Sequence, residues 1–454
     1  MADPRSGAGP APRPSGLTLS ERIPQERSET AFGDYKGEYT RDQALAEANR
    51  CLYCTDAPCV RACPTHIDIP QFIRKIASDN VRGSAKTIFE ANILGMSCAR
   101  VCPVEVLCVG DCVYNHLGQP PIQIGKLQRY ATDRAYERGY EFFAAGPDTG
   151  KSVGLVGAGP ASLAAAHELR RFGHRVTIYE KREALGGLNT TGVAPYKMRA
   201  DRSLDEVEWV LSIGGVEVKA GVAVGEDISL DELERAHDAV FFGAGLGADS
   251  RLGVPGEALA GVEGAVDWIE RMKLGRVSAG VRRAAVVGGG NTALDAVREL
   301  LGLGIAEVTM IYRGTEDKMS GYAHEWKAAK VEGARAEWRA QPVAFEGAGR
   351  VERVLCHRLD DERRPVPDAD FAVEADLVLV AIGQSKLGDQ LARLGGVKVE
   401  RGRVLTDGHG FTGRPKWYAG GDCRNGGTEV VYAAAEGKAA ARAIHAFLSG
   451  ASHA

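Results

Sequence analysis

Eight of the chain's ten cysteines lie in two short runs. The first run is Cys51-x2-Cys54-x4-Cys59-x3-Cys63-Pro64, and the second is Cys98-x3-Cys102-Pro103-x4-Cys108-x3-Cys112. Thiolates at this density, with a proline after one cysteine of each run, are typical ligands of iron–sulfur clusters. Zinc is the rival metal, but it cannot change its redox state and would act only as a structural staple. The runs therefore predict an iron–sulfur domain, in a chain that we expect in the reducing cytoplasm.

Composition and charge limit what the rest of the chain can be. With 454 residues, 44% hydrophobic and 26% charged, the chain can build two or three domains with full cores. A net charge of −4 gives no field that would attract nucleic acid or a membrane surface, and we expect neither as a partner. No run of about 18 apolar residues is present, which excludes a spanning helix. Residues 1 to about 16, rich in Pro, Gly, Ala and Ser, predict a disordered tail and no secretory signal.

The pattern of helices and strands changes near residue 150. We expect a disordered or extended tail at 1–40, a helical [4Fe–4S] domain at 41–145 and a linker at 144–150. Two strand–turn–helix–strand units follow, which predict an α/β protein with an N-terminal all-α iron–sulfur domain and two nested Rossmann-like nucleotide-binding domains. The first nucleotide fold is expected at 151–250 plus 386–454 and the second at 251–385. Helices are expected at Arg41–Arg50, Ile69–Ala77, Ser84–Ala91, Ile124–Glu137 and 431–448, and strands at Val153–Val156, Arg175–Tyr179, Ala284–Val287, Glu307–Tyr312, Ala375–Ile382 and Trp417–Ala419.

The first unit carries a nucleotide signature at Gly157, Gly159 and Ser162. Gly157 permits the tight turn, Gly159 lets a pyrophosphate approach the backbone, and Ser162 is small enough to pack helix on strand. The helix that follows offers free N–H groups and a partial positive charge to phosphates. Glu180, at the end of the next strand, can accept hydrogen bonds from ribose hydroxyls. These residues predict a nucleotide site without deciding which nucleotide binds.

The second unit repeats the signature. Gly288 and Gly290 take the two glycine roles, Asn291 and Thr292 open the helix, and Ala293 stands in the third position. This unit is the expected site of the nicotinamide nucleotide.

Together the two units resemble the pyridine-nucleotide-dependent flavin oxidoreductases with two nested folds. The resemblance implies FAD on the first fold, with Gly187 and Leu188 of Gly186-Gly187-Leu188 as a second flavin contact. Gly421 and Asp422 of Gly420-Gly421-Asp422 match a late motif near the flavin ribityl chain and phosphate. The helix beginning near Val431 resembles the one that faces the isoalloxazine ring. No catalytic proton donor is assigned, because the flavin itself carries the chemistry.

The choice of nicotinamide nucleotide depends on the end of the strand at Glu307–Tyr312. Arg313 follows it, and a basic residue there can neutralise the 2′-phosphate of NADPH, whereas an acid prefers the free hydroxyl of NADH. NADPH-using relatives typically carry two adjacent basic residues, but Gly314 follows here, and Glu316 and Asp317 come soon after. Both donors remain open, with a slight preference for NADH.

The cysteine region resembles the N-terminal part of dihydropyrimidine dehydrogenase and the separate bacterial subunit that corresponds to it. The similarity rests on Cys-Leu-Tyr-Cys-Thr-Asp-Ala-Pro-Cys-Val-Arg-Ala-Cys-Pro, Leu-Gly-Met-Ser-Cys-Ala-Arg-Val-Cys-Pro, Leu-Cys-Val-Gly-Asp-Cys and Ile-Gly-Lys-Leu-Gln. It implies two [4Fe–4S] clusters whose ligands cross between the runs. Cys98 is then a packing cysteine, and without the resemblance Gln128 would be taken as a solvated surface residue. The implied ligands are Cys51, Cys54, Cys59 and Cys112 for one cluster, and Cys63, Cys102, Cys108 and Gln128 for the other.

The resemblance also implies the reaction. Hydride would pass from NAD(P)H to FAD, and single electrons would leave through the clusters to an FMN/iron–sulfur partner that reduces uracil or thymine, since this chain is too short to include the FMN barrel. No cysteine lies between Cys112 and Cys356, so the redox dithiol of disulfide reductases is missing, and Cys356 and Cys423 are expected to be structural. One alternative is the small subunit of glutamate synthase, whose second run is tighter than the spacing from Cys102 to Cys108. Another is a redox sensor that binds nucleotide without turnover. The stretch from Asn189 to Met198 departs from both relatives, which leaves the nicotinamide-side contacts open.

Overall fold

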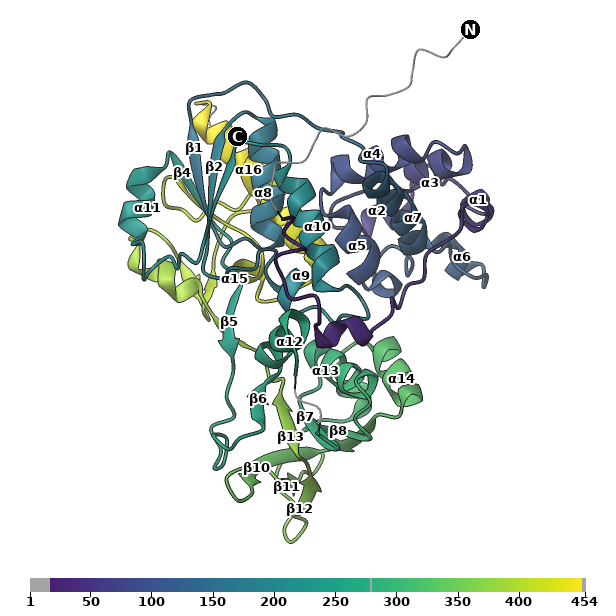
Figure 1. The fold of residues 1–454 in the computed structure, drawn as a ribbon, viewed down its shortest axis with the longest axis vertical. Coiled ribbons are helices and arrows are strands. Elements are labelled where there is room, and N and C mark those ends of the chain that lie inside the picture. Colours follow the sequence, from purple (N-terminus) through teal and green to yellow (C-terminus); the bar gives the residue numbers. More distant parts are fainter. Residues whose placement is uncertain (1–16, 278–279, 451–454) are drawn as a thin grey trace.

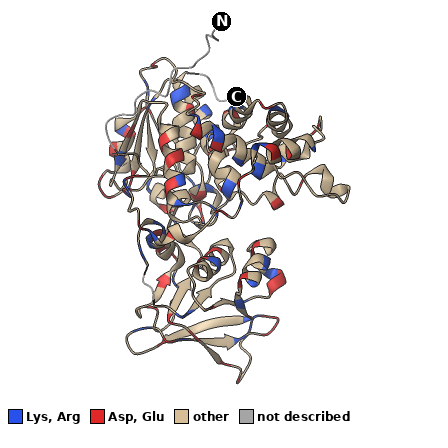
Figure 2. Cartoon of the chain, turned by 45° about the vertical axis from the view of Figure 1, so that its right-hand side comes forward, with Lys and Arg blue, Asp and Glu red and all other residues tan. Residues whose placement is uncertain are grey.

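The computed structural model describes residues 17–277 and 280–450, and the tail expected at 1–16 lies outside them. Three bodies are visible in Figure 1: a helical domain, a first nucleotide fold containing both β1 and the C-terminal helix, and a second nucleotide fold below them. Lys and Arg are interspersed with Asp and Glu over all three bodies (Figure 2). No helix of the described residues is long and apolar enough to cross a membrane.

The helical domain surrounds the cysteines with short helices. Side chains of Thr40, Asp68 and Asn80 accept hydrogen bonds from the third residue of the helices they precede, which fixes where α1, α3 and α4 begin. Buried Phe72 and Leu127 belong to the core, together with four of the cysteines. The elements are α1 (Arg41–Asn49), α2 (Pro58–Arg61), α3 (Ile69–Ala77), α4 (Val81–Ala91), α5 (Gly95–Val101), η2 (Val104–Val106), α6 (Val113–His116) and α7 (Ile124–Glu137).

The first nucleotide fold is a five-stranded parallel sheet in the order β17-β4-β1-β2-β3. Helix α16 packs on α8 so closely that a Cβ at Gly437 would collide with the carbonyl oxygen of Ala161. Because β17 pairs with β4, the chain returns to this sheet after the second fold. Its elements are β1 (Ser152–Val156), α8 (Pro160–Arg171), β2 (Arg175–Glu180), α9 (Leu188–Thr191), α10 (Ala200–Leu211), β3 (Val216–Ala220), α11 (Leu230–Ala236), β4 (Ala239–Phe242), η4 (Gly388–Arg393), β15 (Val399–Glu400), β16 (Arg403–Val404), β17 (Trp417–Ala419), α15 (Asp422–Asn425) and α16 (Val430–Leu448).

The second nucleotide fold is a parallel sheet in the order β6-β13-β7-β8-β9. An antiparallel three-stranded sheet, β10-β11-β12, is inserted between β9 and β13 and forms the lower end of the molecule in Figure 1. Two antiparallel connecting strands, β5 (Leu246–Asp249) and β14 (Gln384–Lys386), join the two folds. The remaining elements are β6 (Val262–Gly264), α12 (Ala265–Leu274), β7 (Arg283–Val287), α13 (Asn291–Gly302), β8 (Glu307–Tyr312), η3 (Glu316–Lys318), α14 (Ala323–Glu332), β9 (Arg335–Trp338), β10 (Ala340–Glu346), β11 (Arg353–Arg358), β12 (Phe371–Glu374) and β13 (Leu377–Val380).

Residues 17–40 lead from the N-terminal side into α1 and include one short helix, η1 (Ser28–Ala31). In Figure 1 this purple segment runs beside α12 and α13 before it reaches the helical domain. Arg27 and Glu29 are buried there, at 4% and 0% exposure, and form an ion pair of 2.8 Å. The part of the expected tail that the structure describes is therefore extended and packed against the folds.

Candidate functional site

The first glycine-rich loop connects β1 to α8. Gly157 has φ +87°, and a Cβ there would lie 2.8 Å from the carbonyl oxygen of Gly243, so only glycine fits. Gly159 is the N-cap of α8, and no side chain caps the helix. The first N–H groups of α8 therefore remain available to a ligand such as a pyrophosphate.

Glu180 and Ser162 hold this loop in place. Glu180 is 7% exposed, and its carboxylate accepts hydrogen bonds from the backbone N–H of Ala158 at 2.7 Å and of Arg182 at 2.9 Å. Ser162 is fully buried and donates to the carbonyl oxygen of Val156 at 3.4 Å, so it packs α8 against β1 as a third glycine would.

Two more glycine turns meet the first loop. Gly187 has φ +56°, and a Cβ there would lie 2.8 Å from Cα of Gly159. Gly421 has φ +76°, and its N–H donates to Glu436 at 2.6 Å. The carboxylate of Asp422 accepts a hydrogen bond from the N–H of Thr428 at 3.2 Å, and burial raises its pKa above the ordinary range. The structure therefore brings together three backbone turns that are far apart in the sequence.

The second glycine-rich loop has the same construction. Gly288 has φ +143°, and a Cβ there would collide with the carbonyl oxygen of Ala381. Gly290 caps α13 without a side-chain hydrogen bond, which again leaves N–H groups free for phosphate. The Asn291 side chain accepts a hydrogen bond from the N–H of Tyr322 at 3.0 Å and so fixes the loop before α14.

Arg313 is exposed at the end of β8. Gly314 is buried, and a Cβ there would lie 2.7 Å from the ring of Tyr312. A second basic residue at 314 would therefore have to displace that ring. Two acids, Glu316 and Asp317, follow Arg313 in the sequence. Glu316 forms an ion pair of 2.5 Å with Lys330 of α14.

A cavity of about 560 Å³ lies where the three bodies meet, which is within the usual size of a cofactor site. Residues of the helical domain that flank Cys102 also border it. Of the predicted cofactor residues, Ser162, Gly288, Gly290 and Arg313 are not part of its lining. The lining includes Gly157, Gly159, Glu180, Gly187, Leu188, Gly421 and Asp422 of the first fold, Asn291 and Thr292 of the second, and Val101 and Pro103 of the helical domain.

A group of charged side chains lines the cavity between the two nucleotide folds. Lys197 Nζ lies 2.8 Å from Asp295 Oδ1 and 2.8 Å from Glu325 Oε1. Burial opposes the charge, but the two carboxylates outweigh it and hold the pKa of Lys197 above its ordinary range. Tyr322 Oη donates to Glu429 Oε1 at 2.6 Å, and among the described residues Glu325 Oε2 has no hydrogen-bond partner. These pairs tie the second fold to the first beside the cavity.

The sequence did not identify these charged residues. Lys197 belongs to the stretch from Asn189 to Met198 that departs from both relatives, and that departure was the available signal. Asp295 lies one turn after Asn291 in α13, so helical spacing places both on one face.

One set of cysteines gathers around Cys59. Cys51, Cys54 and Cys59 are partly exposed, and Cys112 is buried. Burial, together with the neighbouring sulfurs of Cys51, Cys112 and Cys54, raises the pKa of Cys59 to about 12. Thiolates are the ligands of iron–sulfur clusters, so four neighbouring cysteines are a donor set that fits such a cluster.

The second set lies nearer the cavity. Burial and the neighbouring Cys102, Cys63 and Cys59 raise the pKa of Cys108 well above its ordinary value. Gln128 is 7% exposed, and its Nε2 donates to the carbonyl oxygen of Gly95 at 2.7 Å, which leaves its Oε1 available. Gln128 is therefore a buried residue and not a solvated one. Among the described residues, no three His, Cys, Asp or Glu side chains converge on a single ion position.

Cys98 lies beside Cys102 in this set. Its sulfur accepts a hydrogen bond from Asn92 Nδ2 at 3.0 Å, and its exposure is 4%. The Cys98 thiol and burial together raise the pKa of Cys102 well above its ordinary value. Cys98 therefore packs behind a predicted ligand.

A buried glutamate fixes the helical domain to the first fold. Glu206 of α10 accepts hydrogen bonds from the N–H groups of Met96 at 3.0 Å and Ser97 at 3.1 Å, at the start of α5. Burial raises the pKa of Glu206 to about 7. Helix α5 ends just before Cys102, so this contact sets the position of the second cysteine set relative to the cavity.

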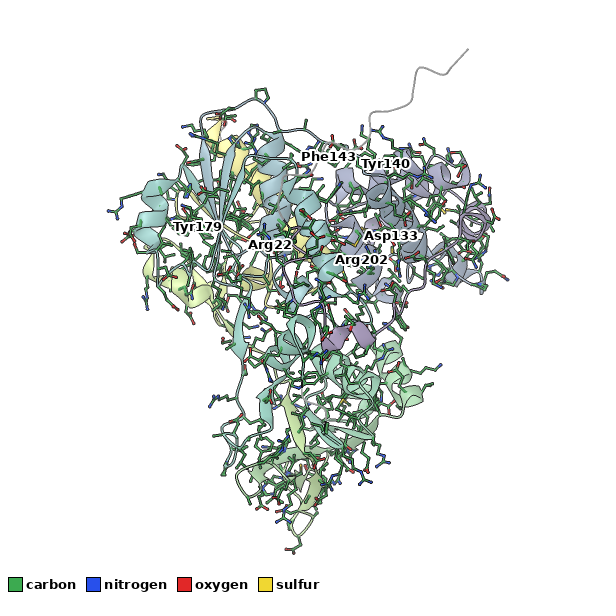
Figure 3. All side chains as sticks on the ribbon, viewed as in Figure 1. Arg22, Asp133, Tyr140, Phe143, Tyr179 and Arg202 are labelled. Carbon is green, nitrogen blue, oxygen red and sulfur yellow. The ribbon has the colours of Figure 1, made fainter. Side chains whose placement is uncertain are left out.

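Aromatic rings also pack in the contact between the helical domain and the first fold, called here the seam. The ring of Trp209 lies 4.4 Å from that of Phe89 and 5.2 Å from that of Tyr136, between ring centroids. Figure 3 shows Tyr140 and Phe143 along the upper part of the same seam. The packing adds a large apolar contact to the polar one made by Glu206.

Comparison with known proteins agrees with this construction. Residues 27–140 match the family model described as dihydropyrimidine dehydrogenase domain II, 4Fe–4S cluster, and residues 151–437 match pyridine nucleotide-disulphide oxidoreductase. The chain belongs to the pyridine nucleotide-disulphide oxidoreductase family. It is an oxidoreductase of the type that combines a 4Fe–4S domain with a flavin and a pyridine nucleotide.

Three relatives show how the family divides. The putative oxidoreductase AegA of Escherichia coli is 35% identical over 93% of this chain and 68% of its own length. The NAD-dependent dihydropyrimidine dehydrogenase subunit PreT of Escherichia coli is 35% identical over 91% of this chain and 96% of its own. The glutamate synthase [NADPH] small chain of Halomonas elongata is 34% identical over 94% and 96%.

Solved structures with a similar fold include FprA of Mycobacterium tuberculosis in complex with NADPH, with a TM-score of 0.55 and 20% identity over 66% of this chain and 85% of that one. Thioredoxin reductase of T. acidophilum has a TM-score of 0.53 and 21% identity over 65% and 98%. The predicted fold class, a helical iron–sulfur domain followed by two nucleotide folds, is confirmed. Cys356 and Cys423 are both buried and free, and they lie in β11 and α15, so in this chain they form no dithiol.

Proposed function

We propose that this protein is an electron-input subunit that takes hydride from NAD(P)H on FAD and releases single electrons through two [4Fe–4S] clusters. The observation that carries the proposal is the shared cavity. It is bordered by the loop at Gly157, by the start of α13 at Asn291 and by the neighbours of Cys102, so donor, flavin and cluster sites adjoin one another.

Each site has residues suited to its cofactor. The free N–H groups of α8 would bind the FAD pyrophosphate, Glu180 would accept from its ribose, and Gly187 and Gly421 would let the backbone approach it. The start of α13 would bind the phosphates of the nicotinamide nucleotide. A flavin at this site would supply the conversion of a two-electron hydride into single electrons.

The surroundings of the cysteines support one order of electron transfer. Val101 and Pro103, which flank Cys102, border the cavity, whereas Cys51, Cys54 and Cys59 are partly exposed. A cluster held by Cys102 would therefore lie nearer the flavin, and a cluster held by Cys51, Cys54 and Cys59 would pass electrons onward to a partner. The seam formed by Glu206 would keep the distance for electron transfer from the flavin to the first cluster short, because Glu206 holds α5 against the fold proposed to bind the flavin.

The acceptor that we propose is an FMN/iron–sulfur subunit that reduces uracil or thymine. This chain spans nearly the whole PreT subunit, and the five residues between Cys102 and Cys108 favour this relative over the glutamate synthase small chain. The glutamate synthase role remains the second candidate, because its small chain matches at similar identity and length. Co-purification decides between them: a pyrimidine-reducing FMN chain supports the first, and a glutaminase-bearing chain overturns it.

The activity itself has a separate test. Anaerobic mixing with NADH or NADPH should bleach the bound flavin rapidly, and this result would exclude a sensor that binds nucleotide without turnover. A flavin that stays oxidised with both donors, or a chain that carries zinc and no iron, would overturn the electron-input function.

A further inference from the structure

The segment of residues 26–38, called here the strap, connects all three bodies. The N–H of Ser28 donates to the carbonyl oxygen of Gly275 in the second fold at 2.8 Å. The carboxylate of Glu29 accepts from the N–H of Ala200, at the start of α10 in the first fold, at 2.9 Å. The path of the strap is thus fixed before it reaches the helical domain.

Arg129 then holds the strap on both sides of Lys36. This side chain is 2% exposed, and its guanidinium lies 2.6 Å from Asp34 and 3.0 Å from Glu38. It also donates to the carbonyl oxygen of Lys36. Arg129 follows Gln128 directly in α7, so the same helix presents a predicted cluster ligand and anchors the strap.

The side chain of Lys36 is directed at the second cysteine set. Its Nζ donates to the carbonyl oxygen of Cys102 at 2.7 Å, and Cys102, Glu105 and Cys108 are its neighbours. Within the described ranges, Lys36 forms no ion pair with a carboxylate. Burial lowers the pKa of Lys36, and the nearby thiols and Glu105 oppose that change. The hydrogen bond to Cys102 therefore holds this ammonium group beside the second cysteine set.

We infer that Lys36 is a tuning residue for the cluster held by Cys63, Cys102 and Cys108, and that its positive charge raises the reduction potential of that cluster. The inference rests on the proposed function, which places a cluster there. Net charge and hydrogen bonds near the sulfurs are the levers by which a protein sets such potentials. A cation close to the cluster stabilises the added electron, so the cavity-side cluster accepts electrons from the flavin more readily.

The strap couples the position of Lys36 to the assembly of the three bodies. Lys36 comes from a segment that also contacts both nucleotide folds, so the charge beside Cys102 is in place only when the three bodies are assembled. The sequence around Lys36 gives no such indication, because an isolated lysine among glycines and acidic residues predicts a solvated side chain.

The test compares two neutral replacements in the full-length protein. Lys36→Gln keeps a donor for the carbonyl oxygen of Cys102, Lys36→Met removes it, and Lys36→Arg restores the charge. Lys86→Met is the matched control, because Lys86 is exposed on α4 of the same domain and its loss changes the net charge equally. Iron and flavin content are measured first, and each cluster potential is then obtained by a redox titration followed by electron paramagnetic resonance.

We expect both neutral variants to retain iron and to lower one of the two potentials. The reduced fraction at a fixed potential should fall at least tenfold, which is 59 mV for one electron. Lys36→Arg and Lys86→Met should leave both potentials close to those of the unmodified protein.

If Lys36→Gln retains full iron and flavin and has the same two cluster potentials as the unmodified protein, the inference is overturned and the proposed function stays intact. Loss of iron in Lys36→Gln, but not in Lys36→Arg, would assign Lys36 to cluster retention and would also overturn the tuning role. Absence of iron from the unmodified protein would overturn the proposed function itself.

Discussion

Gly187→Ala should weaken flavin binding specifically. Gly187 has φ +56° and ψ −146°, a backbone conformation that costs an alanine about 1–3 kcal/mol. Its Cβ would also lie 2.8 Å from Cα of Gly159, and such overpacking costs about 1–3 kcal/mol. The empty loop can relax by moving Gly159, whereas the bound flavin needs that loop in place. The second cost therefore appears in the flavin dissociation constant, which should rise roughly 5- to 150-fold.

The control for this prediction is Gly214→Ala. Gly214 has φ +76° in the turn after α10, and nothing lies within 4 Å of the added methyl group, so this variant carries only the backbone cost. Reconstitution of flavin-free protein with FAD, followed by fluorescence quenching, gives both dissociation constants. If Gly187→Ala binds FAD as tightly as Gly214→Ala does, the approach of the two loops does not form the flavin site.

Three further substitutions examine other parts of the account. Gln128→Ala should remove or weaken one cluster and leave FAD bound, and an unchanged iron content and cluster spectrum would show that Gln128 is not a ligand. Lys197→Met breaks part-buried ion pairs with Asp295 and Glu325, which costs up to about 3–5 kcal/mol, and it should slow flavin reduction in stopped-flow experiments; an unchanged rate would mean that these pairs do not position the second fold. Glu206 has a folded pKa of about 7, above the unfolded value of 4.5, so its ionisation makes the fold less stable as the pH rises through that interval. The melting temperature of Glu206→Gln minus that of the unmodified protein should therefore increase from pH 5 to pH 8. A difference that is constant with pH would contradict this assignment.

Much of the fold could be predicted because its signals are local. The strands at Glu307–Tyr312 and Trp417–Ala419 and the helix at Ile124–Glu137 have the predicted bounds, since apolar runs and glycine turns mark their ends. Both nucleotide loops have the positive φ angles that their glycines suggest. The crossing of ligands between the cysteine runs required the family resemblance, because spacing alone does not determine which sulfurs meet.

The rest depends on contacts between distant segments. The described part of the expected tail is packed because Arg27 and Glu29 bury their charges against each other, and composition does not reveal such pairing. The inserted sheet β10-β11-β12 was not predicted, because its strands are short and apolar and polar residues alternate only weakly along them. The roles of Lys36 and Lys197 become visible only when the folds are assembled around the cavity.

Anaerobic reductive titration of the purified protein tests the central claim most directly. The account predicts one FAD and about eight iron atoms per chain, the number that two [4Fe–4S] clusters require. Stepwise addition of NADH or NADPH should bleach the flavin absorbance and produce the paramagnetic signals of reduced clusters in the same sample. A flavin that bleaches fully while the clusters remain oxidised, with dithionite reducing them afterwards, would contradict electron flow from the flavin to the cysteine domain.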